Sequence, residues 1–200
     1  LPSARIGQGM SGNHTIDLDR LPALTELFAL FNAGRQLNRL RDVALWSELE
    51  RERASYMLLF ERMGYTLRID ERGFAWFHFE DGSSSLSKAS RQIALLCLLL
   101  FEHQADSGRQ LARFTEWRID RSLLAVLVDS HAQVLEAEAL AEVELLAGIL
   151  KTASTYGFAE VDGHGWRLLP AVHRYLDIFE ELVARDDPLP GDNDEAGESP

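Results

Sequence analysis

Side chains that could act as a nucleophile, a general base or a metal ligand occur along the chain, but their spacing brings no set of them together. The chain holds six histidines and one cysteine, and no pair of histidines stands at the spacing of a zinc site. Ser83–Ser85 follows His78 and Asp81, yet the segment lacks the strand–turn–helix that exposes a catalytic serine. Cys97 lies within an apolar run, which is typical of a small core residue. We therefore predict no catalytic residue, no metal site and no cofactor.

Arginine offers a different chemistry, the binding of phosphate groups. Two groups of arginines lie beside expected helix ends, where backbone N–H groups also favour phosphate. Their members are Arg35, Arg39 and Arg41 in the first half and Arg109, Arg113, Arg118 and Arg121 in the second. We interpret these seven residues as candidate DNA contacts. The alternative is a solvated surface with local ion pairs, because Glu116 and Asp120 lie within the second group.

The overall charge limits how the chain could contact DNA. The net charge is −12, whereas a freestanding DNA-binding protein usually has a basic excess that neutralises phosphates. Contact with DNA is therefore expected through a local basic patch, or beside a partner that supplies positive charge. Residues 186–200 contain acidic residues and prolines but no basic residue, which predicts an acidic disordered tail. Residues 1–16 are interpreted as a disordered N-terminal extension.

The apolar runs and the lone cysteine indicate a cytoplasmic protein. The longest apolar run, residues 93–101, is far shorter than the roughly 20 residues that cross a bilayer. A single cysteine cannot form an internal disulfide, and this usage fits a reducing compartment. We expect no contact with a membrane.

Hydrophobic periodicity indicates the elements that must position these side chains. Three-residue and four-residue apolar spacing predicts helices, and alternation predicts strands. The expected helices are 21–32, 41–52, 53–63, 88–104, 120–136, 137–156 and 171–185, and a hairpin is expected over 65–69 and 74–79. The fold class that follows is mainly α with small β-hairpin wings, an α+β protein.

A short pattern occurs twice and predicts a duplicated architecture. Gly64-Tyr65 precedes Ile69–Phe74, and Gly157-Phe158 precedes Val161–Trp166. Both hairpins contain an aliphatic residue and Asp, then two intervening residues, then Gly and an aromatic residue. We expect each of these glycines at a positive φ. Repetition at this distance predicts two tandem winged-helix-like domains, residues 17–81 and 86–185.

Four aromatic residues on the expected wings admit two interpretations. Trp76, Phe77, Phe79 and Trp166 either anchor each wing on its helices or form a surface for a partner, because aromatic residues concentrate in interface cores. We retain them as candidate partner-binding residues.

Several segments in the same order resemble one protein family. They are Leu21–Phe28, Leu37–Leu40, Gly64–Phe77, Arg91–Leu96 and Phe114–Trp117. Together they are similar to MksE, the small subunit of MksBEF condensins, and to its relatives MukE and the B subunit of the Wadjet plasmid-defence systems. The resemblance covers residues 17–185, and its motifs are structural rather than catalytic.

The resemblance implies a non-catalytic tandem winged-helix subunit that forms a homodimer and binds a kleisin subunit of the MksF/MukF type. Through the kleisin it would join an SMC ATPase of the MksB/MukB type. It would contact DNA only in the assembled complex, in the cytoplasm at the nucleoid. The implied role is chromosome organisation and segregation, or plasmid defence.

Two alternatives remain open from the sequence. A winged-helix transcriptional regulator would need a basic recognition helix, but the helix expected over 53–63 offers only Arg53 and Arg62 against Glu61. A small enzyme with an unrecognised site would show activity without any partner.

Overall fold

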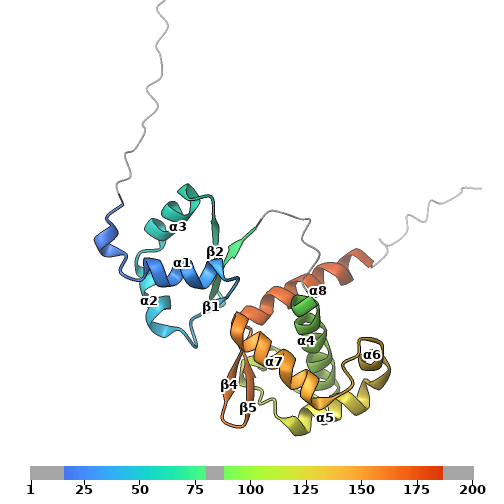
Figure 1. Cartoon of the computed structure of the whole chain (residues 1–200). Helices are drawn as coiled ribbons and strands as arrows, with labels where there is room; N and C mark the ends of the chain where they lie inside the picture. Colours follow the sequence, from blue (N-terminus) through green and yellow to red (C-terminus); the bar gives the residue numbers. More distant parts are fainter. Residues whose placement is uncertain (1–15, 80–87, 187–200) are drawn as a thin grey trace, which may run out of the picture.

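The computed structural model describes residues 16–79 and 88–186, which form two groups of elements (Figure 1). Residues 1–15 of the expected extension, the serine-rich segment within 80–87 and the acidic tail from residue 187 lie outside the described residues. Helices predominate, and the strands form small antiparallel sheets. The prediction of a mainly α protein with small β-hairpins is confirmed. No helix in the described ranges is both long enough and apolar enough to cross a membrane.

The first group of elements combines three helices with a three-stranded antiparallel sheet of order β1-β3-β2. In chain order the elements are η1 (Leu18–Arg20), α1 (Leu24–Asn32), β1 (Leu37–Asn38), α2 (Val43–Arg51), α3 (Arg53–Arg62), β2 (Thr66–Asp70) and β3 (Phe74–His78). Strand β1 was not predicted, because two residues are too short to show alternation. It is held by pairing with β3, with Leu37 opposite Ala75.

Aromatic rings fill the core of this first group. The Phe77 ring centroid lies 5.0 Å from those of Phe31 and Phe60 and 4.8 Å from that of Tyr65. Phe31 and Phe60 are fully buried, and Phe77 is 5% exposed. Offset and edge-to-face ring pairs of this kind add about 0.5–1.5 kcal/mol each beyond the area that they bury. The helices α1 and α3 are therefore fixed on the inner face of the hairpin.

The second group of elements packs several helices around α4. In chain order the elements are α4 (Lys88–Asp106), η2 (Leu111–Glu116), α5 (Arg121–Ser130), α6 (Ala132–Ala137), α7 (Val143–Tyr156), β4 (Ala159–Asp162), β5 (Gly165–Leu168), η3 (Pro170–Val172) and α8 (His173–Asp186). The helix expected over 120–136 is divided at His131, whose φ of −119° is not helical. The helix expected over 137–156 begins only at Val143, because Ala139 adopts a φ of +55°.

The two groups share one order of elements and strands. Ile119 forms an isolated antiparallel bridge with Trp166 of β5. In the first group, β1 precedes two helices and a hairpin, and in the second group Ile119 precedes three helices and a hairpin. The spatial order Ile119–β5–β4 matches β1-β3-β2. The duplication visible in the sequence thus extends to strand order.

The glycines of the repeated pattern serve different purposes, which corrects one expectation. Gly64 and Gly157 both end a helix, with φ of +86° and +85°, and Gly73 has the expected positive φ of +97°. Gly165, its counterpart in the second hairpin, does not have a positive φ; Gly163 does. At Gly165 an added Cβ would stand 2.4 Å from the Ile119 carbonyl oxygen. That glycine is required by close backbone approach rather than by its own conformation.

Candidate functional site

Strand β3 joins the two groups of elements because both of its faces are buried. Ala75 and Phe77 belong to the core of the first group, whereas Phe74 belongs to the core of the second. Trp76 is half-buried and packs against that second core. Successive side chains of a strand point to opposite faces, so the hairpin lies between two hydrophobic cores. We call the region around β3, in which residues of the two groups of elements contact each other, the joint.

Asn38 is the polar centre of the joint. It is fully buried, and its side-chain amide donates hydrogen bonds to the carbonyl oxygens of Gly157 at 2.8 Å and Gln36 at 3.2 Å. Its side-chain oxygen accepts a hydrogen bond from the Ala171 N–H at 3.3 Å. One side chain thus satisfies three backbone groups from both groups of elements, and such groups are costly to leave unpaired when buried.

Gly157 allows the backbones of the two groups to approach one another at the joint. It follows α7 in the left-handed conformation, and a Cβ at this position would stand 2.4 Å from the Gln36 carbonyl oxygen. The Gln36 N–H also donates to the Tyr156 carbonyl oxygen at 2.8 Å. Backbone contacts of this length need a residue without a side chain at position 157.

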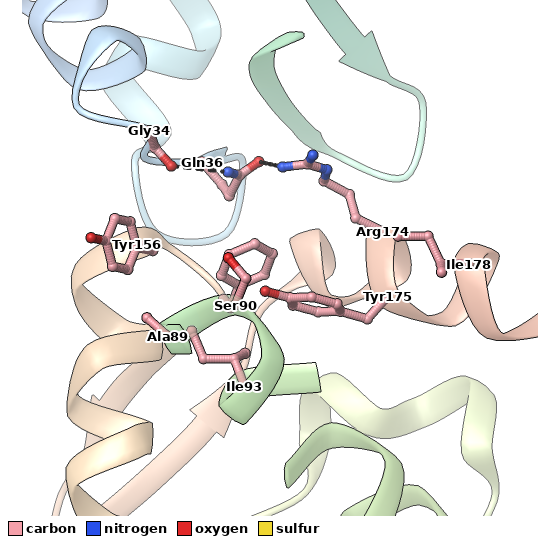
Figure 2. Close-up of a pocket in the computed structure, with 10 residues that line it drawn as sticks. Gly34, Gln36, Ala89, Ser90, Ile93, Tyr156, Arg174, Tyr175 and Ile178 are labelled. Atoms are coloured by element: carbon pink, nitrogen blue, oxygen red, sulfur yellow. Dashed lines mark hydrogen bonds between the residues drawn. The ribbon is translucent and has the colours of Figure 1, made fainter. Parts of the chain in front are cut away.

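Arg174 of α8 spans the joint with its guanidinium group. Figure 2 shows the side chain reaching from α8 toward Gln36, to whose Oε1 it donates a hydrogen bond at 3.0 Å. The guanidinium also lies 4.7 Å from the centroid of the Trp76 ring, a cation–π distance. Burial lowers the pKa of Arg174. The indole and the amide oxygen replace part of the hydration that this cation loses.

Arg72 crosses from the tip of the β2–β3 hairpin to α8. It donates two hydrogen bonds to Asp177, at 2.7 and 2.6 Å, and two to Asp70, at 2.9 and 2.8 Å. The hydrogen bonds from Arg72 hold the pKa of the Asp70 carboxyl below its ordinary value. Paired forks of this geometry fix orientation as well as charge, so the hairpin tip is held against α8.

A cavity of about 280 Å³ lies at the edge of the joint. Figure 2 shows its wall, to which Gln36, Ser90, Tyr156 and Tyr175 contribute polar atoms. Burial raises the pKa of Tyr175 to about 12, so its phenol stays neutral and is a poor base. Cys97 is fully buried in the neighbouring core, and desolvation raises the pKa of its thiol to about 12. Within the described ranges, no three His, Cys, Asp or Glu side chains gather as metal ligands would.

The first arginine group does not form one basic surface. Arg41 is half-buried in the joint, where it pairs with Asp42 and donates to the Ser154 carbonyl oxygen at 3.2 Å. Its role as a DNA contact stays a prediction. Arg35 is half-buried, and its Nε has no hydrogen-bond partner among the described residues. Arg39 is exposed, with its side chain against Gly73. The three were grouped by sequence proximity, but the chain reverses between them.

The second arginine group is exposed, and part of its charge is neutralised. Arg113 binds Glu116 at 3.0 and 2.5 Å, which raises the pKa of Arg113. Arg121 pairs with Glu144 of α7. Arg109 and Arg118 form no ion pair with any described residue. Local ion pairs therefore engage two of the four arginines, and the role of this group in binding DNA stays a prediction.

The four wing aromatics lie in different environments. Phe77 is a core residue, and Trp166 is 6% exposed, so both side chains pack within the chain, and their assignment as partner-binding residues stays a prediction. Trp76 is covered by Arg174. Phe79 is 60% exposed just after β3 and remains a candidate contact. Alternation along β3 separates these residues, since Phe77 and Phe79 share a face but only Phe77 has helices above it.

An apolar groove that sequence patterns did not reveal lies between α4, η2 and α8. Its volume is about 460 Å³, and Leu98 and Leu111 on its rim are 45% and 40% exposed. The apolar stripe of α8 forms one wall and continues past it: Leu176 and Phe179 pack on the core, whereas Leu182 and Val183 are 52% and 67% exposed. Among the described residues, only the first half of the expected stripe is covered.

His173 gives this groove a testable pH response. Its ring lies edge-on to Phe114 at 4.9 Å, and burial, followed by the charge of Arg72, lowers the pKa of His173 below its ordinary 6.5. The unfolded chain then binds a proton more readily than the folded chain, so stability is lost as the pH falls below about 6.5. Urea unfolding of the His173→Gln variant between pH 7 and 5 should show a shallower loss than the unsubstituted protein.

The exposed hairpin residue His164 supplies the control for this experiment. The substitution His164→Gln should leave the pH dependence as it is in the unsubstituted protein. Identical slopes for all three proteins would contradict a role for His173.

Comparison with known proteins identifies one family over most of the described residues. The family model described as condensin complex protein MksE matches residues 22–180. No curated protein matches the chain. The matched span begins two residues before α1, includes both hairpins, and ends within α8. The resemblance first indicated by ordered sequence segments is thereby confirmed. The chain belongs to the MksE family of condensin complex proteins.

Proposed function

We propose that this chain is a non-catalytic, kleisin-associated subunit of an SMC condensin-type complex. It bridges the kleisin, the SMC ATPase and DNA, in chromosome organisation and segregation or in plasmid defence, in the cytoplasm at the nucleoid. Membership of a family of condensin complex proteins supports the complex itself. The observation that carries the adaptor role is the uncovered second half of the α8 stripe beside an apolar groove.

We infer that each group of elements is a winged-helix domain, with boundaries at 17–81 and 86–185. The support is the shared strand order and the position of a hairpin directly after a helix in both groups. In the first, α3 precedes the hairpin, and in the second α7 does. The joint then acts as a rigid link, because its hydrogen bonds come from elements of both domains.

The kleisin is proposed to occupy the apolar groove with an amphipathic segment. Exposed apolar stripes beside a groove are typical of sites that receive a partner helix. Leu98 and Leu111 on the rim, together with Val183 on the projecting part of α8, would lose their exposed surface on binding. Burial of apolar area at about 25 cal/mol per Å² is the expected driving force. A homodimer of the chain within the complex forms part of the same proposal.

The double substitution Leu182→Asp with Val183→Asp should weaken binding to a kleisin-type partner subunit by at least tenfold. Two carboxylates would have to lose water in an apolar contact, which is costly without a cation nearby. Isothermal titration of the purified proteins gives the affinity, and sedimentation equilibrium of the complex gives the number of copies of each chain.

The matched control is Val126→Asp with Val134→Asp, which introduces the same charges on α5 and α6. Val126 and Val134 are 44% and 46% exposed, so this variant should bind within about twofold of the unsubstituted chain. An unchanged affinity for the α8 variant would contradict the groove as the kleisin site. Tight, sequence-specific DNA binding by the isolated chain would instead favour the alternative of a transcriptional regulator.

A further inference from the structure

Two adjoining hollows lie beside η2, and they share no lining residue with the apolar groove. One has a volume of about 190 Å³ and is lined by Gln104, Arg109, Glu116, Trp117 and Arg118. The other, of about 300 Å³, shares Arg109, Glu116 and Trp117 and adds Arg113. Three of the arginines that line them, Arg109, Arg113 and Arg118, are candidate DNA contacts from the sequence.

The charge of the hollows is positive. Arg109 and Arg118 are exposed and have no ion-pair partner in the described part of the chain. The one carboxylate that lines both hollows, Glu116, is bound by Arg113 through two hydrogen bonds. The remaining two guanidinium groups are therefore available to an anion.

Gln104 is the second, independent indication of a ligand. It lies on the last turns of α4 and is 7% exposed, and its side-chain amide makes no hydrogen bond within residues 16–79 and 88–186. The amide atoms of Gln104 are not among the buried side-chain atoms that lack a hydrogen-bond partner, so the amide group opens into the hollow instead of being sealed in the core. The amide lines the smaller hollow beside Arg109 and Arg118, where a ligand oxygen would satisfy it.

The neighbouring hairpin extends this face. An added Cβ at Gly163, at the tip of the β4–β5 hairpin, would lie 3.6 Å from a terminal nitrogen of Arg118. Val161 on the same hairpin is 68% exposed. The cationic hollows and the wing tip therefore form one surface, longer than a single small anion would need.

We propose that the two hollows bind successive phosphates of a nucleic-acid backbone, with Arg109 between them and the Gln104 amide donating to a phosphate oxygen. Hollows that share one arginine suit a ligand whose anionic groups repeat along a chain. Backbone phosphates fit this pattern and take most of the hydrogen bonds in protein–DNA contacts. This inference rests on the proposed function in a complex that encloses DNA. It identifies the surface with which this chain contacts the DNA.

The test uses the full chain and a fluorescein-labelled 20-base-pair duplex at low ionic strength. The double variant Arg109→Ala with Arg118→Ala should raise the Kd at least tenfold and reduce the slope of log K against log salt by about 2, because each phosphate contact contributes about 0.9. The control variant Arg62→Ala with Arg68→Ala makes the same change in net charge. It replaces two exposed arginines of α3 and β2, in the first group of elements. That control should change the Kd less than threefold.

Gln104→Leu separates the pocket from general electrostatics. The variant keeps every charge, so the Kd should rise about fivefold, the loss of one hydrogen bond of about 1 kcal/mol, with an unchanged salt slope. In ¹⁵N spectra of the unsubstituted chain, the Gln104 side-chain amide should shift on addition of the duplex.

Three results would overturn the proposal. Equal weakening by both double arginine variants would show long-range attraction alone. A Gln104 shift that poly-glutamate reproduces at the same concentration would identify a carboxylate site, and a shift with inorganic phosphate but not with the duplex would exclude the backbone. The kleisin titration contains no DNA. Failure of this chain to bind a kleisin would therefore contradict the proposed function without contradicting the phosphate-binding hollows.

Discussion

Replacement of Asn38 by leucine is expected to lower the free energy of unfolding by about 3–5 kcal/mol. Leucine has a similar volume but no polar atom, so the change leaves the carbonyl oxygen of Gly157 and the N–H of Ala171 buried without their partner. It also removes one of the two side-chain hydrogen bonds that the Gln36 carbonyl oxygen accepts. Each such group costs about 1–3 kcal/mol. Urea unfolding followed by tryptophan fluorescence measures the change, since tryptophans lie in both groups of elements.

The control for this prediction is Asn32→Leu, at the end of α1. Asn32 is exposed and makes a weak contact of 3.5 Å with the Tyr65 hydroxyl. Its replacement should change the free energy of unfolding by no more than about 0.5 kcal/mol. Equal losses at positions 38 and 32 would show that the joint does not hold the two groups together in solution.

The substitution Gly157→Ala should lower the free energy of unfolding by about 3 kcal/mol or more, for two reasons. The backbone at this position has a φ of +85°, which costs alanine about 1 kcal/mol or more. The new methyl group would also stand 2.4 Å from the Gln36 carbonyl oxygen. Because that atom belongs to backbone, relief requires the two groups of elements to move apart.

Gly64→Ala is the matched control, and it isolates the second cost. Gly64 ends α3 with a φ of +86°, and an added Cβ would meet no atom within 4 Å. Its replacement should therefore cost only the conformational strain of about 1 kcal/mol. The difference between the two variants in urea unfolding measures the contact across the joint. Equal destabilisation would mean that Gly157 and Gln36 are not in contact in solution.

These two predictions bear on the proposed function through the rigidity of the joint. A subunit that binds a kleisin segment and a DNA backbone on separate surfaces can position one relative to the other only if the distance and orientation between those surfaces are fixed. In this chain that relation depends on Asn38, on the Arg174–Trp76 contact and on the Arg72–Asp177 pair. The variants Asn38→Leu and Gly157→Ala weaken the joint. They therefore allow the folding of each group of elements to be compared with the assembly of the complex.

Local patterns in the sequence determined most of the secondary structure and the family. Apolar spacing along one helix, such as Leu27, Leu30 and Phe31 of α1, depends on neighbours three or four residues away, so it can be read without knowledge of the fold. The hairpin over β2 and β3 follows equally from alternation and a turn glycine. Ordered segments distributed over the chain were enough for the resemblance that the family match confirms.

Only the tertiary structure decided which faces were covered. Alternation placed Phe77 on a wing but could not show that helices lie above it, and the spacing of Arg41 could not show that it turns toward Ser154. The same holds for β1, for the Ile119 bridge and for Gly165, whose requirement comes from a backbone more than forty residues away in the chain. Helices and turns are set by near neighbours, whereas burial, pairing and close approach depend on segments that meet only after folding, and the sequence carries no local period for those contacts.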